Sequence, residues 1–88
     1  MKIHIPGSRS LKDKRSVVKS LLMRLQKQFN ISIAEVGDHD LWQMTTIGIA
    51  CVSNHTDHVD EVISAAISLV GRDFPTIEII EKEQDIFG

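Results

Sequence analysis

The chain has 88 residues, of which 42% are hydrophobic and 25% charged, which suits one small folded domain and argues against disorder. A single cysteine excludes an internal disulfide and is typical of a reducing compartment. No apolar run approaches the roughly 18 residues that a membrane span needs. We therefore expect a single domain over residues 1–88 that is cytoplasmic and has no membrane partner.

The charges are strongly segregated along the sequence. The first 29 residues hold eight of the ten basic residues and one carboxylate, a formal charge of +7. Residues 30–88 hold two cations and eleven carboxylates, a formal charge of −9, so the net charge of −2 conceals a polarised molecule. Such segregation attracts anions to one end of a protein.

The first predicted elements are a strand and an amphipathic helix. Residues 2–5 alternate polar and apolar, which is typical of a half-buried strand, and the Pro-Gly pair at 6–7 ends it. Ser10 with Asp13 three residues later resembles a capping box, in which Asp replaces the usual Glu or Gln. Over residues 11–29, apolar side chains recur at helical spacing on one face: Leu11, Val18, Leu21, Leu22, Leu25 and Phe29.

The middle of the chain predicts a β-hairpin. Residues 31–36 form its first strand, the polar cluster at 37–40 its turn, and residues 41–53 its second strand. Apolar or small residues occupy both faces of this second strand, which predicts a central strand buried on each side. One face holds Ile47, Ile49 and Cys51, and the other holds Gly48, Ala50 and Val52.

The last predicted elements are a helix and a strand. The helix begins at Asn54, and Gly71 is its expected C-terminal cap. Residues 76–80 form the last strand, followed by a charged tail. The inner stripe of the helix consists of Val59, Val62, Ile63, Ala66, Ile67 and Val70.

This order of elements predicts an α+β fold. Strand, helix, strand, strand, helix, strand with right-handed crossovers gives the ferredoxin-like βαββαβ sandwich. Its four-stranded antiparallel sheet carries two helices on one face. The other face is open, and we consider two interpretations of it: a homodimer interface, tested by Ile47→Glu or Ile49→Glu, or a surface with scattered apolar residues.

Several sequence motifs are more specific than the predicted strands and helices alone would require. The first is His4-Ile-Pro-Gly-Ser-Arg-Ser-Leu-Lys-Asp-Lys-Arg15, and further ones are Phe29-Asn-Ile-Ser-Ile-Ala-Glu-Val36, Asp40-Leu-Trp-Gln43 and His58-Val-Asp-Glu-Val62. Together they resemble the bacterial YlxP-like family, a domain of unknown function. The resemblance implies a ferredoxin-like fold. It also implies a link to translation, because genes of the family often lie beside those for translation initiation and ribosome maturation factors. Family members usually have several more residues before the histidine, which leaves two interpretations: either the start was assigned late or the first strand is short.

The densest positive charge coincides with the first of these motifs. The loop residues Ser8, Arg9 and Ser10 precede a helix N-terminus, where backbone N–H groups favour anions. Lys12, Arg15 and Lys19 recur at spacings of three and four and form a stripe on the helix. We predict that these six residues form an anion- or RNA-binding surface; the alternative is a solvated helix face. Lys14 falls on the apolar side, and we expect its stem to pack while its ammonium reaches solvent.

Other chemistry-bearing residues are assigned ordinary roles. His55 and His58 have metal-binding spacing but no third ligand, so we expect surface residues and no metal. We expect His4 to be structural, Cys51 an inert core thiol, and Trp42 to pack at the sheet edge, or to stack on a base if exposed. We find no catalytic constellation and predict no cofactor and no enzyme; the remaining alternative is an enzyme that uses His4, which His4→Ala would inactivate.

The sequence therefore predicts a translation-linked domain that binds rRNA or the ribosome without catalysis. Contact to the RNA backbone is expected, with low sequence specificity and no DNA specificity. The alternative is a homo-oligomeric module that uses its open sheet face as a dimer interface and binds a small anion or an acidic protein partner.

Overall fold

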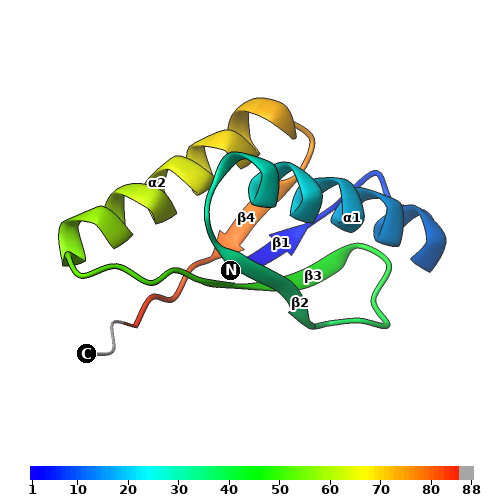
Figure 1. Ribbon diagram of the computed structural model, residues 1–88. Helices are drawn as coiled ribbons and strands as arrows, with labels where there is room; N and C mark the ends of the chain where they lie inside the picture. The colour runs from blue at the N-terminus through cyan, green and yellow to red at the C-terminus, as the bar shows by residue number, and fades with distance from the viewer. Residues whose placement is uncertain (86–88) are drawn as a thin grey trace.

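The computed structural model describes residues 1–85, which form four strands and two helices. Both helices lie on the same side of the sheet (Figure 1). In chain order the elements are β1 (Lys2–His4), α1 (Leu11–Gln28), β2 (Ser32–Gly37), β3 (Met44–Ala50), α2 (Thr56–Asp73) and β4 (Glu78–Glu81).

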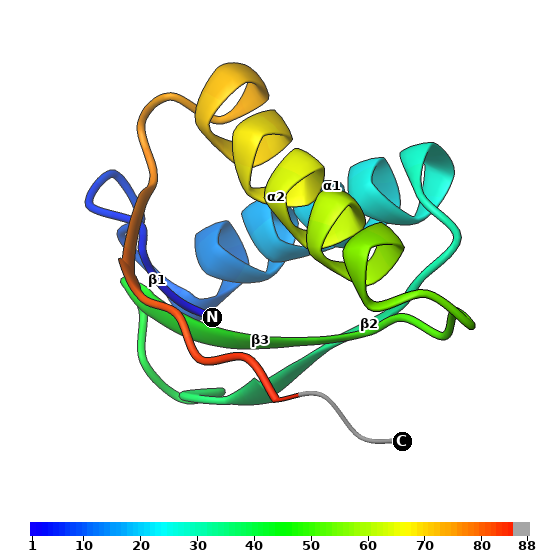
Figure 2. The same cartoon turned by 90° about the vertical axis from the view of Figure 1, so that its left-hand side faces the viewer.

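The strands form one sheet in the order β2-β3-β1-β4, and each neighbouring pair is antiparallel. Figure 2 shows the two helices crossing above this sheet and the opposite face left uncovered. The arrangement confirms the predicted α+β ferredoxin-like fold and the central position of β3. Among the residues described, no helix is both long enough and apolar enough to cross a membrane.

Helix α1 begins and ends where local signals predict. The side chain of Ser10 is the N-cap and accepts a hydrogen bond from the backbone N–H of Asp13 at 3.1 Å. Phe29 closes the other end, where its N–H donates to the carbonyl of Leu25 at 2.9 Å. The buried face of the helix consists of Lys14, Val18, Leu21 and Leu25.

Helix α2 is placed differently from the prediction at both ends. It begins at Thr56 rather than Asn54, and its N-cap His55 supplies no side-chain bond. At the other end the helix continues through Gly71 to Asp73, so the predicted cap at Gly71 is wrong. Pro75 accounts for the later end, because the residue before a proline disfavours helical geometry, and Phe74 leaves the helix.

The core lies between the helices and one face of the sheet. Its buried side chains are Ile3, Ile5, Val18, Leu21, Leu25, Ile47, Ala66, Leu69 and Val70. On β3, Thr45 and Ile47 are buried beneath the helices, whereas Ala50 is exposed on the opposite face and Val52 beyond it is 97% exposed. The predicted burial of this strand on both faces is therefore wrong. Because Ile47 belongs to the core, a charge placed there tests folding rather than dimerisation.

Strands β1, β3 and β4 are shorter than predicted, and the differences at β1 and β3 shape the surface. The turn between β2 and β3 extends through residues 38–43, with Asp38 in the left-handed region at φ 60°, a conformation that aspartate tolerates. Strand β1 spans three residues, one fewer than predicted, and pairs with only part of the seven-residue β3.

Candidate nucleic-acid interface

The outer side of α1 and the loop before it carry five exposed cations: Arg9, Lys12, Arg15, Lys19 and Lys27. Within residues 1–85, none of the five takes part in an ion pair. Lys12, Arg15 and Lys19 follow one another at spacings of three and four, which places them side by side on the helix surface. The predicted cationic stripe is thus exposed to solvent.

The serines of the predicted site are engaged within the loop itself. Ser8 is buried, and its hydroxyl donates to the carbonyl of Ser10 at 3.1 Å. The hydroxyl of Ser10 accepts the N–H of Asp13, whose carboxylate in turn accepts the N–H of Arg9 at 3.1 Å. A carboxylate therefore already occupies part of the positive helix end that would favour an external anion. Contacts to an anion here depend on the basic side chains rather than on the serine hydroxyls.

Lys14 differs most from its predicted role. Its side chain is 0% exposed, and its Nζ donates to the backbone carbonyls of Asp38 at 2.7 Å, His39 at 2.9 Å and Met44 at 3.2 Å. The prediction that its ammonium reaches solvent is therefore wrong. Three carbonyls satisfy the three donors of the ammonium, which is the condition for burying a charge. Lys14 thereby fixes the β2–β3 turn to the first turns of α1.

A carboxylate completes this buried polar cluster. Glu35 Oε2 lies 3.3 Å from Lys14 Nζ, and the same oxygen accepts a hydrogen bond from the hydroxyl of Thr45. Thr45 is fully buried on β3, and the Glu35 side chain is largely covered on β2. The cluster joins α1, β2 and β3 through one charge-assisted network.

Gln43 connects the β2–β3 turn to the loop before α1. Its Nε2 donates to the carbonyls of Pro6 at 3.1 Å and Ser8 at 3.0 Å. The two loops therefore lie together at one end of the molecule, next to the start of α1 (Figure 1). Beside Gln43, Trp42 is 57% exposed and Leu41 48% exposed. An exposed aromatic ring thus lies at the same end of the molecule as the first cations of the stripe.

Other cations of the N-terminal segment are paired with carboxylates. Lys2 Nζ lies 3.9 Å from Asp38, and Arg24 Nη2 lies 3.0 Å from Asp73, which joins α1 to the end of α2. Asp73 also accepts a hydrogen bond from Arg72 at 2.9 Å. The hydrogen bond from Arg72, with a further one from Arg24, lowers the pKa of Asp73 below its ordinary 3.8. Its bond to Asp73 also raises the pKa of Arg72.

The histidines do not come together in a metal site. Over residues 1–85, no three His, Cys, Asp or Glu side chains are grouped so as to hold a metal ion. His55 and His58 are exposed at the start of α2. His4 lies on the open sheet face, with Nδ1 3.6 Å from a carboxylate oxygen of Glu78.

Comparison with known proteins assigns the family. The family model described as "Protein of unknown function (DUF503)" matches residues 1–84. The chain belongs to the DUF503 family.

A curated relative of this DUF503 chain is "Uncharacterized protein YlxP" of Bacillus subtilis (strain 168). The two are 42% identical over 69 residues, which cover 78% of this chain and 74% of the relative. The resemblance to the YlxP-like family found in the sequence is thereby confirmed.

Sequence reasoning missed the residues that hold this end of the DUF503 domain together. Lys14 was placed on the correct helix face, but its carbonyl partners are 24 to 30 residues away in sequence. Gln43 ends one of the family motifs, but nothing in the sequence predicted that its side chain bonds to the loop at residues 6–8. A lysine on the apolar side of a helix, as at Lys14, was the one available sign of a buried ion pair.

Proposed function

We propose that this DUF503 domain binds RNA, and in particular rRNA or the ribosome, through Arg9 in the loop before α1 and through Lys12, Arg15 and Lys19 on the first half of that helix. The proposal rests on one observation: the fold uses some of the N-terminal cations in internal contacts and leaves the others exposed to solvent. Lys2, Lys14 and Arg24 are used internally, whereas Arg9, Lys12, Arg15 and Lys19 face solvent and form no ion pair within residues 1–85. A row of solvated cations on one helix face suits phosphate contacts.

The hydrogen bonds between α1, the β2–β3 turn and the loop at residues 6–8 favour a surface that is formed before binding. Lys14 and Gln43 tie the β2–β3 turn and the loop at residues 6–8 to α1. Trp42 projects from this turn with more than half of its surface exposed. An exposed indole beside cations can stack on an unpaired base while basic side chains contact the phosphates. This combination favours folded RNA with an accessible loop or bulge over plain duplex.

The proposal is tested by reversing two exposed charges of the stripe. We expect Lys12→Glu/Arg15→Glu to weaken binding to a 16S rRNA fragment by at least about tenfold in filter binding at low salt. Each lost phosphate contact also reduces the slope of log K against log salt by about one. Both substitutions place carboxylates near the N-terminus of α1, so the helix itself should remain stable.

The matched control is Lys27→Glu/Lys82→Glu, which makes the same change in net charge at exposed positions outside the stripe. We expect its affinity to remain within about twofold of the unchanged protein, because non-contacting charges act only through the screened long-range field. Equal losses in the two double variants, or no binding of RNA at low salt, would contradict the proposal. Trp42→Ala should weaken binding to a looped RNA more than to a duplex of equal length.

A further inference from the structure

Strand β2 forms one edge of the sheet, and its outer side is free. It pairs with β3 on its inner side, and β3 separates it from β1 and β4. Within residues 1–85, no strand lies beside the outer side of β2. This edge is remote from Met1, which bonds to the opposite side of β3, and from β4 at the other edge of the sheet.

The register of the sheet shows which peptide groups of β2 point outward. Ile47 on β3 exchanges two backbone hydrogen bonds with Met1, at 2.9 and 2.7 Å, so its peptide groups point toward β1. Glu35 lies opposite Ile47 in a pair without hydrogen bonds, so the N–H and C=O of Glu35 point away from β3. Those of Ile33, two residues earlier, do the same. The ring Nε2 of His39 lies 3.2 Å from the Glu35 carbonyl oxygen, which leaves both peptide groups of Ile33 and the N–H of Glu35 for a further strand.

The composition of β2 does not protect this edge against pairing. Sheet edges commonly carry a lysine, a proline or an inward charge that a further strand would leave buried and unpaired. Strand β2 contains neither lysine nor proline, and its one charged residue is Glu35. That carboxylate lies 3.3 Å from Lys14 Nζ and is already paired. Addition of a strand therefore strands no charge.

Helix α1 places two cations beside the same edge. The helix packs on β2, and Arg24 on one of its flanks bonds to Asp73 of α2. At about 100° per residue, Arg15 and Lys19 lie on the flank opposite Arg24, which faces the outer edge of β2. Figure 2 shows α1 passing over β2 at this edge of the sheet. Both cations are exposed, and in the described part of the chain neither forms an ion pair.

We propose that the outer edge of β2 binds an extended, acidic segment of a partner polypeptide, which adds to the sheet as a further strand. Its peptide groups pair with those of Ile33 and Glu35. Side chains of the added strand alternate between the two faces of the sheet, so those on the helix side meet Arg15 and Lys19 and are acidic. Those on the open face lie beside the exposed Val36 and are apolar.

The same geometry disfavours a second copy of this chain as the partner. Pairing of two β2 strands brings Arg15 and Lys19 of both copies to one junction, where they repel each other. Pairing of β2 with β4 of a second copy is a head-to-tail contact that does not close and extends into fibres. A different, acidic polypeptide meets neither obstacle.

The test uses the full chain and a short fluorescent peptide of alternating glutamate and valine. We expect a saturating concentration of this peptide to slow hydrogen exchange at the amides of Ile33 and Glu35 by at least about tenfold, because each amide gains a strand partner. The amide of Ala34, which faces β3, is the internal reference. Proline at two adjacent central positions of the peptide removes a ladder donor in either register, so we expect anisotropy to show binding at least about tenfold weaker.

Two variants of the chain test the cations and the edge separately. Arg15→Glu/Lys19→Glu should weaken peptide binding by at least about tenfold. Its matched control Lys27→Glu/Lys82→Glu makes the same change in net charge at other exposed positions and should stay within about twofold. Ile33→Pro removes an outward N–H without breaking the ladder to β3, and should weaken binding by at least about fivefold. If this variant does not fold, the exchange of the two β2 amides in the unchanged protein decides.

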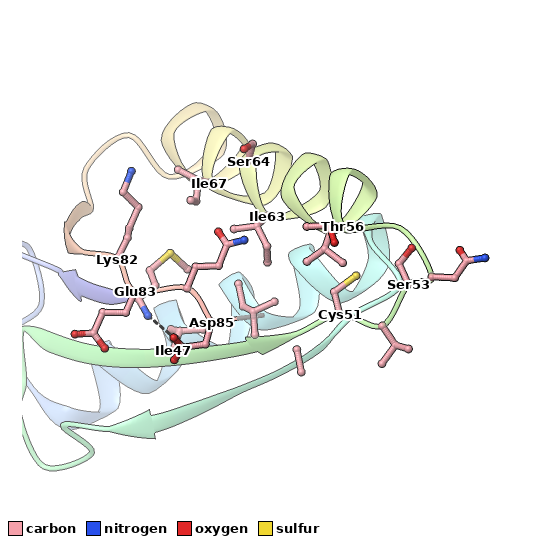
Figure 3. Close-up of a pocket in the computed structure, with 17 residues that line it drawn as sticks. Ile47, Cys51, Ser53, Thr56, Ile63, Ser64, Ile67, Lys82, Glu83 and Asp85 are labelled. Carbon is pink, nitrogen blue, oxygen red and sulfur yellow. Dashed lines mark hydrogen bonds between the residues drawn. The ribbon is translucent and has the colours of Figure 1, made fainter. Parts of the chain in front are cut away.

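The groove between α2 and the end of β3 is another place where a peptide with valines can bind. Figure 3 shows Ile63 and Ile67 facing β3 across this groove of about 930 Å³, which Cys51 also lines. Glu83 and Asp85 lie on its rim and repel an acidic peptide. We therefore expect the peptide to change the reaction rate of Cys51 with a thiol reagent by less than about twofold.

Three results would overturn the proposal: unchanged exchange at Ile33 and Glu35, equal binding of the proline peptide, or protection of Cys51 by the peptide. Slower exchange that depends on protein concentration alone would also overturn it, because it would assign the edge to a second copy. Peptide binding is measured without RNA. Since RNA contacts cations and not the edge amides of β2, failure of this proposal is distinguishable from failure of the proposed RNA binding.

Discussion

The ammonium of Lys14 illustrates how a charge is accommodated in the interior of a small domain. Removing such a group from water costs several kcal/mol, and this cost must be offset by partners with good geometry. Three carbonyls and the Glu35 carboxylate supply them. Because the carbonyls belong to the β2–β3 turn and its flanks, the same contacts that solvate the charge also fix the turn.

We predict that Lys14→Met is strongly destabilising. The substitution leaves Glu35 and the turn carbonyls without their donor, and breaking a buried pair in this way costs about 3 kcal/mol or more. Urea unfolding followed by circular dichroism measures the loss. Lys12→Met, at an exposed position of the same helix, should change the free energy of unfolding by less than about 0.5 kcal/mol.

The double variant Lys14→Met/Glu35→Gln tests whether the unpaired charge of Glu35 causes the destabilisation of Lys14→Met. With both charges removed, we expect at least about 1 kcal/mol of the loss to be recovered. If the double variant is no more stable than Lys14→Met alone, the turn carbonyls rather than Glu35 account for the destabilisation.

At the scale of the elements, the bounds of a helix were predicted well where its sequence contains both the capping signal and the apolar periodicity. Helix α1 was expected at residues 11–29 and spans Leu11–Gln28, because its cap and its apolar period lie within the segment. Helix α2 passes through Gly71, since glycine permits a helix end without requiring one, whereas Pro75 enforces it. The third strand was predicted from residue 41 but begins at Met44, because contacts from Lys14 and Gln43 hold the preceding residues in a turn.

The candidate site, like the helices, could be predicted from the sequence only in part. Helical spacing was sufficient to identify the exposed stripe of Lys12, Arg15 and Lys19. The burial of Ser8 and the contacts of Lys14 depend on residues distant in sequence, which no periodicity reveals.

The contact between the ends of the two helices should depend on pH. The lowered pKa of Asp73 means that its carboxylate is stabilised in the folded state by Arg72 and Arg24. Its contribution is complete above the ordinary pKa of 3.8 and is lost as the pH falls through the lowered value. We therefore expect the unfolding midpoint of Asp73→Asn in urea to lie below that of the unchanged protein at pH 7. The difference should shrink below about pH 4.

The control for this prediction is Asp57→Asn, an exposed carboxylate outside the ion pairs of the described residues. This substitution removes one carboxylate without breaking a contact between the helices, so equal effects of the two variants at pH 7 would indicate a general charge effect. A difference for Asp73→Asn that persists unchanged at low pH would show that packing, rather than charge, holds the two helices together there.

At the scale of the whole molecule, the two faces of the sheet differ in burial and in the residues they carry. The face beneath the helices supplies the core. The open face combines the Lys2–Asp38 ion pair and the contact of His4 with Glu78 with the exposed side chains of Val36 and Ile80. A mixed surface of this kind is ordinary for a monomer, so it gives the dimer hypothesis little support.

We predict opposite outcomes for a glutamate placed on each face. Ile47→Glu should unfold the domain, because it buries an unpaired carboxylate in the core. Val36→Glu should retain the native circular dichroism spectrum, because Val36 is 60% exposed. Sedimentation equilibrium of the Val36→Glu protein then tests the open face. A dimer in the unchanged protein that this substitution dissociates would support the homo-oligomeric alternative, whereas identical masses would contradict it.

The enclosure of Lys14 also has a consequence for chemical labelling. Amine-reactive reagents require an accessible neutral amine, so they should modify Lys12 and Lys19 in the native protein and leave Lys14 untouched until the turn at residues 38–44 opens. The ratio of these modification rates, read by mass spectrometry, then gives the free energy of that local opening. One buried side chain thus provides an intrinsic gauge of motion at the end of the molecule where we place RNA binding.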